Sequence, residues 1–299
     1  MATGRCTDAD LFLRHDTGPG HPERPARLTA ILDAVADLSW TDVPPRDATR
    51  DELLAVHDAA YLDALERRIA DGARALDADT VVSADSWRAA VRAAGAALAL
   101  GEAWFAGTIA NGFAFVRPPG HHACRNRAMG FCLLGNVAIL ARFLHAKARR
   151  VAIVDWDVHH GNGTQDALER DDGVGFVSLH QMPLWPGTGR ASERGIGNVV
   201  NVPMAPGSGD AEYLAAFDET VVPFVESRAP DVVIVSAGFD AHLADPLAQC
   251  RVTTEGFGAM AERLASRWPV LAVLEGGYDL AALAASVRVV SGTLIEKGS

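Results

Sequence analysis

The chain of 299 residues lacks an apolar run long enough to span a membrane, and it lacks a secretory signal. The longest candidate run, from Ala96 to Val116, is interrupted by Glu102 and Asn111. A transmembrane helix needs about 20 consecutive apolar residues. The first ten residues contain no basic segment followed by an apolar core. We therefore expect a cytoplasmic protein without a membrane partner.

Cysteine is scarce, with four residues that show no C-x-x-C spacing: Cys6, Cys124, Cys132 and Cys250. This scattered pattern argues against a disulfide framework and against a zinc site built from thiolates. We expect all four cysteines to be free thiols that pack as small apolar side chains in a reducing compartment.

The chain has fewer basic than acidic residues: it contains 27 Lys and Arg and 38 Asp and Glu, which gives a net charge of −11. Phosphate binding requires a basic face, so the charge balance argues against nucleic acid as a partner. A nucleotide-binding domain is also disfavoured, because Gly161-Asn-Gly163 fits neither of the common phosphate-binding glycine patterns. The acidic balance suits a cationic substrate such as a lysine-rich segment or a polyamine, and it equally suits ordinary solubility.

The chain shows no internal repeat, low-complexity tract or linker, so we expect a single domain over residues 1–299. In five short runs successive residues are mostly apolar, so both faces of each predicted strand are apolar, as expected of strands buried in a parallel sheet. These runs are Phe113–Val116, Val151–Val154, Val174–Leu179, Val232–Val235 and Val270–Leu274. Alanine-rich segments with helical periodicity lie between them, such as Ser86–Ala106 and Tyr213–Ser227. This alternation predicts an α/β three-layer sandwich with a central, mostly parallel sheet.

Polar, glycine-rich segments follow each predicted strand. They are residues 117–123, residues 155–163, His180, residues 236–240 and residues 275–278. Open α/β sheets place their active sites at the carboxyl ends of the strands. The sequence therefore predicts one functional site assembled from these five segments.

A metal site is predicted from Asp157, His159 and Asp240. Alternate side chains of extended backbone project to the same side, so Asp157 and His159 can reach one ion, and Asp240 can join them from another strand end. Two carboxylates and one imidazole suit Zn²⁺, with Fe²⁺ or Co²⁺ as alternatives, and three protein ligands leave room for water and substrate. The alternative is that the aspartates only cap helices. The adjacent His160 should point away and act as a hydrogen-bonding structural residue.

An acid–base pair is predicted at His121 and His122. Amide hydrolysis needs a base for the attacking water and an acid for the leaving amine, and two imidazoles with different partners can divide these roles. Asp155 and Asn162, beside the metal ligands, are the natural acidic and neutral partners.

Aromatic side chains complete the predicted site. The phenol of Tyr278 can donate to the oxyanion that forms when water adds to a carbonyl. Phe131, next to Gly130, and Trp185 can form the walls of a narrow channel, although each of these aromatics could equally be a packing residue.

The motifs RPPGHHA, GFC, DWDVHHGNGTQ, SLH, SAGFDAHLADPL and EGGY together resemble the histone deacetylase superfamily, which includes lysine deacetylases and acetylpolyamine amidohydrolases. HPERPAR at His21–Arg27 and LAVHDAAY at Leu54–Tyr61 are also similar to family motifs. The likeness runs from His15 to the final helix, and the RPPGHHA and HHGNGTQ forms are closer to class II than to class I. The resemblance implies the arginase/deacetylase-like fold.

The resemblance also implies roles for individual residues. Zinc would be held by Asp157, His159 and Asp240, with His121 and His122 as the acid–base pair, Asp155 and Asn162 as their supports and Tyr278 as the oxyanion donor. Further implied sites are the channel lining at Gly130, Phe131 and Trp185, an acetate cavity at Arg27, a substrate-binding rim position at Asp79, and a structural K⁺ site at Asp155, Asp157, His159, Ser178 and Leu179.

The substrate stays open between several classes. Leu247 stands where animal polyamine deacetylases carry an acidic gatekeeper, which favours acetyl-lysine of proteins or peptides over acetylpolyamines or other small amides. Tyr278 is retained where weakened members have histidine, which favours full activity over a silent acyl-ligand binding module. A homo-oligomer is compatible with the family.

Overall fold

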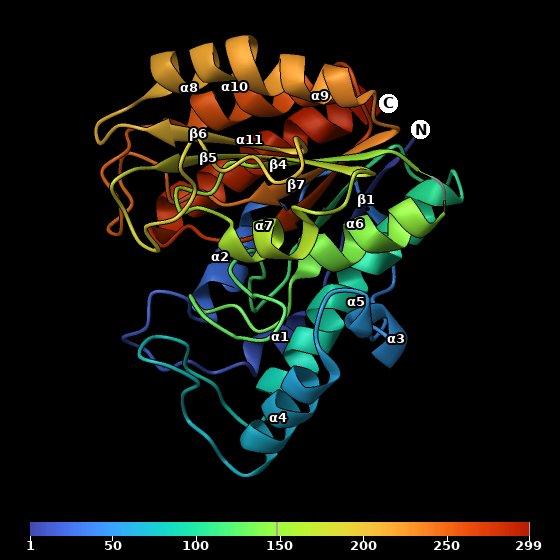
Figure 1. Cartoon of the computed structure of the whole chain (residues 1–299), viewed down its shortest axis with the longest axis vertical. Coiled ribbons are helices and arrows are strands. Elements are labelled where there is room, and N and C mark those ends of the chain that lie inside the picture. Colours follow the sequence, from blue (N-terminus) through green and yellow to red (C-terminus); the bar gives the residue numbers. More distant parts are fainter. Residues whose placement is uncertain (148, 299) are drawn as a thin grey trace.

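A computed structural model describes residues 1–147 and 149–298, and its centre is a parallel β-sheet (Figure 1). The eight strands described are all parallel, in the spatial order β2-β1-β3-β8-β7-β4-β5-β6. Their bounds are β1 Thr3–Cys6, β2 Thr41–Asp42, β3 Asn111–Ala114, β4 Val151–Asp155, β5 Val174–Gln181, β6 Val199–Met204, β7 Val232–Ala237 and β8 Val270–Leu274.

Helices cover both faces of the sheet and make the three layers that the sequence predicted (Figure 1). One face carries α8 Asp210–Ala216, the π-helical turn η1 Phe217–Val221, α9 Val222–Arg228, α10 Thr254–Ala265 and α11 Leu280–Gly298. The other face carries α5 Ser86–Phe105, α6 Asn136–Ala146 and α7 Asn162–Leu168. The shorter helices α1 Ala9–Leu13, α2 Ala26–Ala34, α3 Arg50–Leu54 and α4 Ala59–Ala70 pack against these layers, with α2 on α11 and α4 on α5.

The central strands form where β-branched residues are consecutive. β4, β7 and β8 are buried along their whole length, so both faces of each strand contact helices. β3 begins two residues earlier than predicted. Its first residue, Asn111, donates from Nδ2 to the carbonyl of Leu294 and accepts at Oδ1 from the amide of Val270, which ties β3 to its neighbours.

Three strands escaped the prediction because their sequences lack a continuous apolar run. β1 is polar and contains Gly4, β2 has only two residues and is exposed, and β6 contains Pro203. β2 and β6 are the outermost strands, and an edge strand tolerates proline because one side of it makes no ladder hydrogen bonds.

The predicted helix over Tyr213–Ser227 is present but is not uniformly α-helical. η1 interrupts it, and the amide of Val222 bonds to the carbonyl of Phe217 five residues earlier. The next residue, Pro223, has no N–H with which to continue the α-helical pattern.

The fold brings the polar segments together, because the carboxyl ends of all eight strands lie along one edge of the sheet. All four cysteines are buried free thiols, which confirms that prediction. Within the described residues, no helix combines the length and apolar character needed to cross a membrane.

Candidate metal centre and active site

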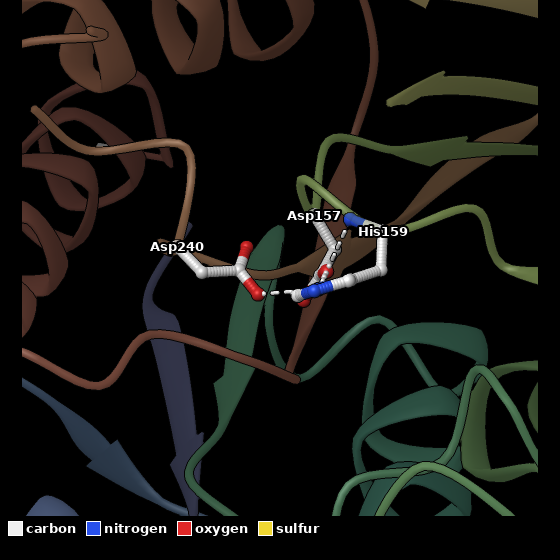
Figure 2. Close-up of side chains that lie close together, drawn as sticks. All are labelled: Asp157, His159 and Asp240. Carbon is white, nitrogen blue, oxygen red and sulfur yellow. Dashed lines mark hydrogen bonds and ion pairs between the residues drawn. The ribbon is translucent and has the colours of Figure 1, made fainter. Parts of the chain in front are cut away.

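The metal site predicted at Asp157, His159 and Asp240 is assembled in the structure (Figure 2). Asp157 and His159 follow β4, Asp240 follows β7, and one ligand atom from each residue lies within 4.8 Å of the others. Nδ1 of His159 is 3.2 Å from Oδ1 of Asp157 and 3.0 Å from Oδ2 of Asp240. All three side chains are buried.

The electrostatics of these three residues are those of a cation site. Burial and the negative charge of Asp157 raise the pKa of Asp240 above its usual range. Burial alone would lower the pKa of His159, but its hydrogen bonds with the two carboxylates outweigh burial and raise the pKa to about 10. Two carboxylates side by side in a buried site require nearby positive charge; without a metal the protonated His159 supplies it, and a bound divalent cation would take over this role.

The residues around the triad also fit a metal ion. The amides of Val158 and Gly276 donate to Asp240 Oδ1 and Asp157 Oδ2, at 2.8 and 2.9 Å, and so fix both carboxylates. A Cβ atom at Gly276 would lie 2.4 Å from Asp240 Oδ2 and 2.6 Å from Asp157 Oδ2, so only glycine leaves this side open. Carboxylate oxygens and an imidazole nitrogen are ligands that zinc accepts.

The predicted histidine pair lies beside the triad. The rings of His121 and His122 are 3.9 Å apart between centroids. Nδ1 of His121 is 3.0 Å from Oδ2 of Asp155, and Nδ1 of His122 is 2.8 Å from Oδ1 of Asn162. The structure therefore gives the two histidines one acidic and one neutral partner, and it assigns Asp155 to His121 and Asn162 to His122.

The two histidines have opposite pKa shifts. Burial lowers the pKa of His122 well below its usual value, and the positive charges of His121 and His159 add to this effect. Burial also acts against a charged His121, but Asp157 and Asp155 outweigh it and raise the pKa of His121 well above its usual value. A cation bound by Asp157 would oppose the last effect. Paired groups with opposite shifts are typical of acid–base sites.

Glu275 is a site residue that sequence reasoning missed. It follows β8, and its buried carboxylate accepts from the amides of Gly120 and His121 at 2.6 and 3.1 Å. Burial raises the pKa of Glu275 to about 7. This contact joins the histidine segment to the segment that carries Tyr278. The only signal in the sequence is an acid directly after a buried strand.

The backbone at Tyr278 is held by Asp245 and Arg27. Oδ2 of Asp245 accepts from the amide of Tyr278 at 2.7 Å. Arg27, predicted to line an acetate cavity, donates to the carbonyls of Glu275 and Gly277 and lies over the Tyr278 ring, 5.1 Å from its centroid. Asp245 was also missed, because its contact depends on a tertiary approach of two loops.

A cavity of about 200 Å³ opens above the metal and histidine residues. The five residues predicted to bind substrate all line it: Asp79, Gly130, Phe131, Trp185 and Leu247. His122, His159 and Tyr278 lie in the same lining, together with Leu184, which was not predicted. The structure thus brings the predicted rim, channel and reacting groups to one cavity.

Gly130 allows the cavity walls to approach each other. Its φ of +57° belongs to the left-handed region, and a Cβ atom there would lie 2.5 Å from the Trp185 ring and 2.6 Å from the His122 ring. The two rings are stacked edge to face, 4.7 Å apart between centroids. A side chain at position 130 would therefore displace a wall or the histidine.

His160 confirms its prediction as a hydrogen-bonding residue, and it anchors the loop that carries Trp185. Its Nδ1 and Nε2 are 2.8 and 2.9 Å from Thr188 Oγ1 and Gln165 Oε1. Gln165 donates to Glu193 at 3.0 Å, and Glu193 also accepts from the backbone amide of Gly189. The loop of residues 182–195 is therefore held in place by hydrogen bonds to His160 and Gln165.

The residues implied for a K⁺ ion lie on two adjacent strands and the loop that follows one of them. Asp155 ends β4 and is paired in register with Ser178 on β5, next to Leu179. Ser178 Oγ is 2.9 Å from Nδ1 of His180, which lies inside β5 because that strand continues to Gln181. The K⁺ role stays a prediction.

Comparison with known proteins agrees with this site. The histone deacetylase domain matches residues 21–294. Histone deacetylase 15 of Arabidopsis thaliana is 42% identical over 291 residues, which cover 92% of this chain and 53% of the plant protein. The histone deacetylase-like amidohydrolase of Pseudomonas aeruginosa is 38% identical over 288 residues, which cover 90% of this chain and 75% of that protein.

A solved structure is similar over almost the whole chain. The crystal structure of the HDA15 HD domain matches with a TM-score of 0.94 and 40% sequence identity, and the match covers 99% of this chain and 89% of the other. Together with the Asp157–His159–Asp240 triad, these matches show that the chain belongs to the histone deacetylase family and is an amidohydrolase of the deacetylase type with a metal-site triad.

Proposed function

We propose that the protein is a zinc-dependent deacetylase that removes acetyl groups from acetyl-lysine in proteins or peptides. The observation that carries the proposal is the cavity, whose aromatic and aliphatic walls lead to His122, His159 and Tyr278. Such walls suit an uncharged aliphatic chain that ends in an amide.

The proposed chemistry depends on groups that the chain itself supplies. Asp157, His159 and Asp240 would hold the zinc ion, which would supply Lewis-acid polarisation of the substrate carbonyl and of the attacking water. His122 accepts the proton of the attacking water at Nε2, because Asn162 occupies its Nδ1. The His121–His122 pair returns a proton to the leaving amine.

Tyr278 stabilises the developing oxyanion by donating its hydroxyl hydrogen. Its ring meets Phe131 edge to face, with centroids 5.9 Å apart, so the channel wall and the oxyanion donor support each other. Asp79 at the rim is available to accept from the substrate backbone, and its pKa is raised by partial burial and by the charge of Asp77.

A structural K⁺ ion at Asp155, Asp157, His159, Ser178 and Leu179 is part of the proposal. It would add positive charge beneath the catalytic groups and lower the cost of burying Asp155 and Asp157 together. Replacement of K⁺ by a large organic cation in the assay buffer is expected to lower activity if this ion is present.

Leu247 is the observation that favours acetyl-lysine over acetylpolyamine. It lines the cavity with an apolar side chain, whereas a polyamine presents ammonium groups that need an acid at the mouth. Asp79 is the carboxylate in the cavity lining, and a carboxylate favours the polyamine. The test below therefore includes an acetylpolyamine.

The test is the hydrolysis of an acetyl-lysine peptide and an N-acetylpolyamine side by side, with and without a chelator and zinc. Turnover of the peptide that chelator abolishes and zinc restores supports the proposal. Faster turnover of the polyamine would leave the proposed mechanism unchanged and would contradict the choice of acetyl-lysine as substrate. Turnover of neither substrate refutes the proposed function and supports an acyl-ligand binding module.

A matched pair of variants sharpens the substrate assignment. Leu247→Glu places an acid in the lining and is expected to raise the ratio of polyamine to peptide kcat/KM by about tenfold. Leu243→Glu is the control, because Leu243 is exposed on the same segment and lies outside the cavity lining. An equal response of both variants contradicts the role of Leu247.

A further inference from the structure

The side-chain amide of Asn162 lies between His122 and two sulfur atoms. Its Oδ1 is 2.8 Å from Nδ1 of His122. Its Nδ2 lies 3.4 Å from Sγ of Cys124 and 3.5 Å from Sδ of Met129. The donor end of the amide therefore faces only weak acceptors, and the acceptor end faces the histidine.

The direction of this amide decides the tautomer of His122. A carbonyl oxygen can only accept, so Nδ1 of His122 must carry the hydrogen, and Nε2 keeps its lone pair toward the cavity. An amide turned by 180° would present its N–H groups to Nδ1. The hydrogen of His122 would then lie on Nε2, and the ring could not accept a proton there.

The two sulfur atoms oppose that turned orientation. Met129 Sδ carries no hydrogen, so it can accept from an amide but cannot donate to one. The thiol of Cys124 directs its own hydrogen toward the carbonyl of His122, at 3.7 Å, or toward Met129 Sδ, at 4.0 Å, and offers Asn162 a lone pair. Turning the amide would place Oδ1 against Met129 Sδ, which cannot donate, and the Cys124 thiol could donate to it only by giving up its present hydrogen bond.

The packing leaves the amide few other partners. Cys124 is buried and Met129 is half-buried, and both lie in the segment between His122 and the cavity wall at Gly130. The guanidinium of Arg127 donates to Met129 Sδ at 3.1 Å and so holds the sulfur in place. Asn162 is the first residue of α7, and its backbone is fixed because the amides of Gly163 and Thr164 donate to the carbonyl of His121.

We propose that Cys124 and Met129 are positioning residues that set the orientation of the Asn162 amide and thereby the tautomer of His122. This proposal rests on the proposed function, in which His122 accepts a proton at Nε2. Neither residue belongs to the lining of the cavity described above. They act because both accept from the Asn162 amide, while Met129 has no hydrogen to donate to the amide oxygen and the Cys124 hydrogen is engaged elsewhere.

The first test compares kinetics in matched variants. Cys124→Ala/Met129→Leu removes both acceptors and keeps the site apolar, and kcat for the substrate found above is expected to fall about three- to tenfold with KM within twofold. Cys124→Ser retains an acceptor and is expected to keep most of the activity. Wild-type kcat in the double variant would overturn the proposal.

An Asn162→Asp background separates positioning from general damage. A carboxylate has two equivalent oxygens, so it has no orientation for the sulfur atoms to select. Addition of Cys124→Ala/Met129→Leu to Asn162→Asp is expected to cause less than a twofold further loss of kcat. A further loss as large as that in the Asn162 background shows a structural effect and overturns the proposal.

The second test reads the tautomer directly and needs neither metal nor substrate. In protein labelled with ¹⁵N in histidine, the ring nitrogen that carries hydrogen has a different chemical shift from the bare one, and the His122 signals are those missing in His122→Gln. We expect Nδ1–H in the wild type and a second population with Nε2–H in the double variant. Nε2–H in the wild type overturns the proposal even if the protein is an active deacetylase, whereas an inactive wild type with Nδ1–H contradicts only the proposed function.

Discussion

Individual residues at the site are held largely through their backbones. Tyr278 is an example, because Asp245 accepts from its amide and Arg27 donates to the carbonyls of Glu275 and Gly277. Charged side chains from two other segments therefore position the phenol. None of these contacts uses its hydroxyl, which can donate to a substrate.

Replacement of Tyr278 by Phe is expected to lower kcat about a hundredfold or more, by analogy with the loss of one oxyanion donor. The backbone contacts of residue 278 do not involve the hydroxyl, so the melting temperature should stay within a few degrees of that of the wild type. Tyr61→Phe is the control, because that hydroxyl donates to the carbonyl of Leu133 outside the cavity lining. Unchanged turnover of Tyr278→Phe in a steady-state assay would refute the assigned role.

Replacement of Gly130 by Ala is expected to raise KM and lower kcat/KM by about tenfold or more. The new Cβ would meet Trp185 and His122 within 2.6 Å, so a cavity wall or the histidine must move. Gly187→Ala is the control, since Gly187 also has a positive φ but nothing within 4 Å of the added atom. Equal kinetic losses in the two variants would point to backbone strain instead of the contact.

Among the elements, the loop of residues 182–195 depends most on polar contacts. Trp185 is 42% exposed, so apolar packing alone does not fix it. Glu193 accepts from the amides of Gly189 and Arg190 and from Gln165, and Gln165 reaches His160 beneath the loop. The position of the tryptophan wall therefore depends on a partly buried hydrogen-bond network.

Replacement of Glu193 by Ala is expected to raise KM about three- to tenfold with a smaller change in kcat, because the loop loses its anchor while the reacting groups stay in place. Tryptophan fluorescence quenching by iodide should report a more accessible Trp185. Arg190→Ala is the control, since its side chain is exposed and the loop contact uses only its backbone amide. Normal KM and quenching in Glu193→Ala would show that the network does not hold the loop.

The strands that could be predicted are those with several consecutive apolar residues, because such a run indicates a strand buried on both faces. β4, β7 and β8 each begin with an unbroken run of β-branched or apolar residues, so their predicted positions were nearly correct. β1 could not be found in this way, because Thr3, Gly4 and Arg5 become a strand only when β3 lies beside them. The π-helical turn at Phe217–Val221 likewise has no periodic signature in the sequence.

On the scale of the whole molecule, a buried ion cluster joins the N-terminal segment to the sheet. Glu23 accepts from Arg117 through both carboxylate oxygens and from Arg27, and all three side chains are fully buried. Burial by itself would raise the pKa of Glu23, but the two guanidinium groups outweigh it and lower the pKa to about 2. The cluster also supports the Tyr278 segment through Arg27.

The cluster predicts acid-sensitive stability. The folded pKa of Glu23 is below the usual 4.5, so its contribution to the free energy of unfolding is complete above pH 4.5 and is lost as the pH falls toward 2. Burial lowers the pKa of His15 to about 4, so its protonation below pH 6.5 also favours the unfolded chain. Thermal unfolding followed by circular dichroism should show the midpoint falling steadily from pH 6.5 to pH 3.

Replacement of Glu23 by Gln is expected to cost about 3 kcal/mol or more at pH 7, because it leaves two buried guanidinium groups without a counter-ion. The unfolding midpoint should fall by roughly 5 to 10 °C. The dependence on pH below 4.5 should also weaken. Glu66→Gln on the exposed side of α4 is the control, and a similar midpoint in both variants would contradict the role of the cluster.

More of the candidate site than of the fold could be predicted from the sequence. Asp157, His159 and Asp240 each follow a recognisable strand, so parallel topology alone brings them to one edge. Glu275 and Asp245 could not be assigned, since each acts on backbone amides of another segment and nothing in its own neighbours shows which segment comes near. Cys124 was expected only to pack as a small apolar side chain, and its contact with Asn162 was not predicted for the same reason.

The strand order has a consequence for how the protein is made. β8 is the last strand described along the chain, yet it lies between β3 and β7 in the middle of the sheet. On the ribosome, β3, β4 and β7 emerge before it, and until residues 270–274 arrive the two halves of the sheet present open edges. Glu275 and Tyr278 follow directly, so the ability to process a substrate is acquired only after residues 270–278 have been made. Ribosome-bound chains stopped shortly before residue 270 should therefore be held by chaperones, whereas released chains that include residues 270–298 should not.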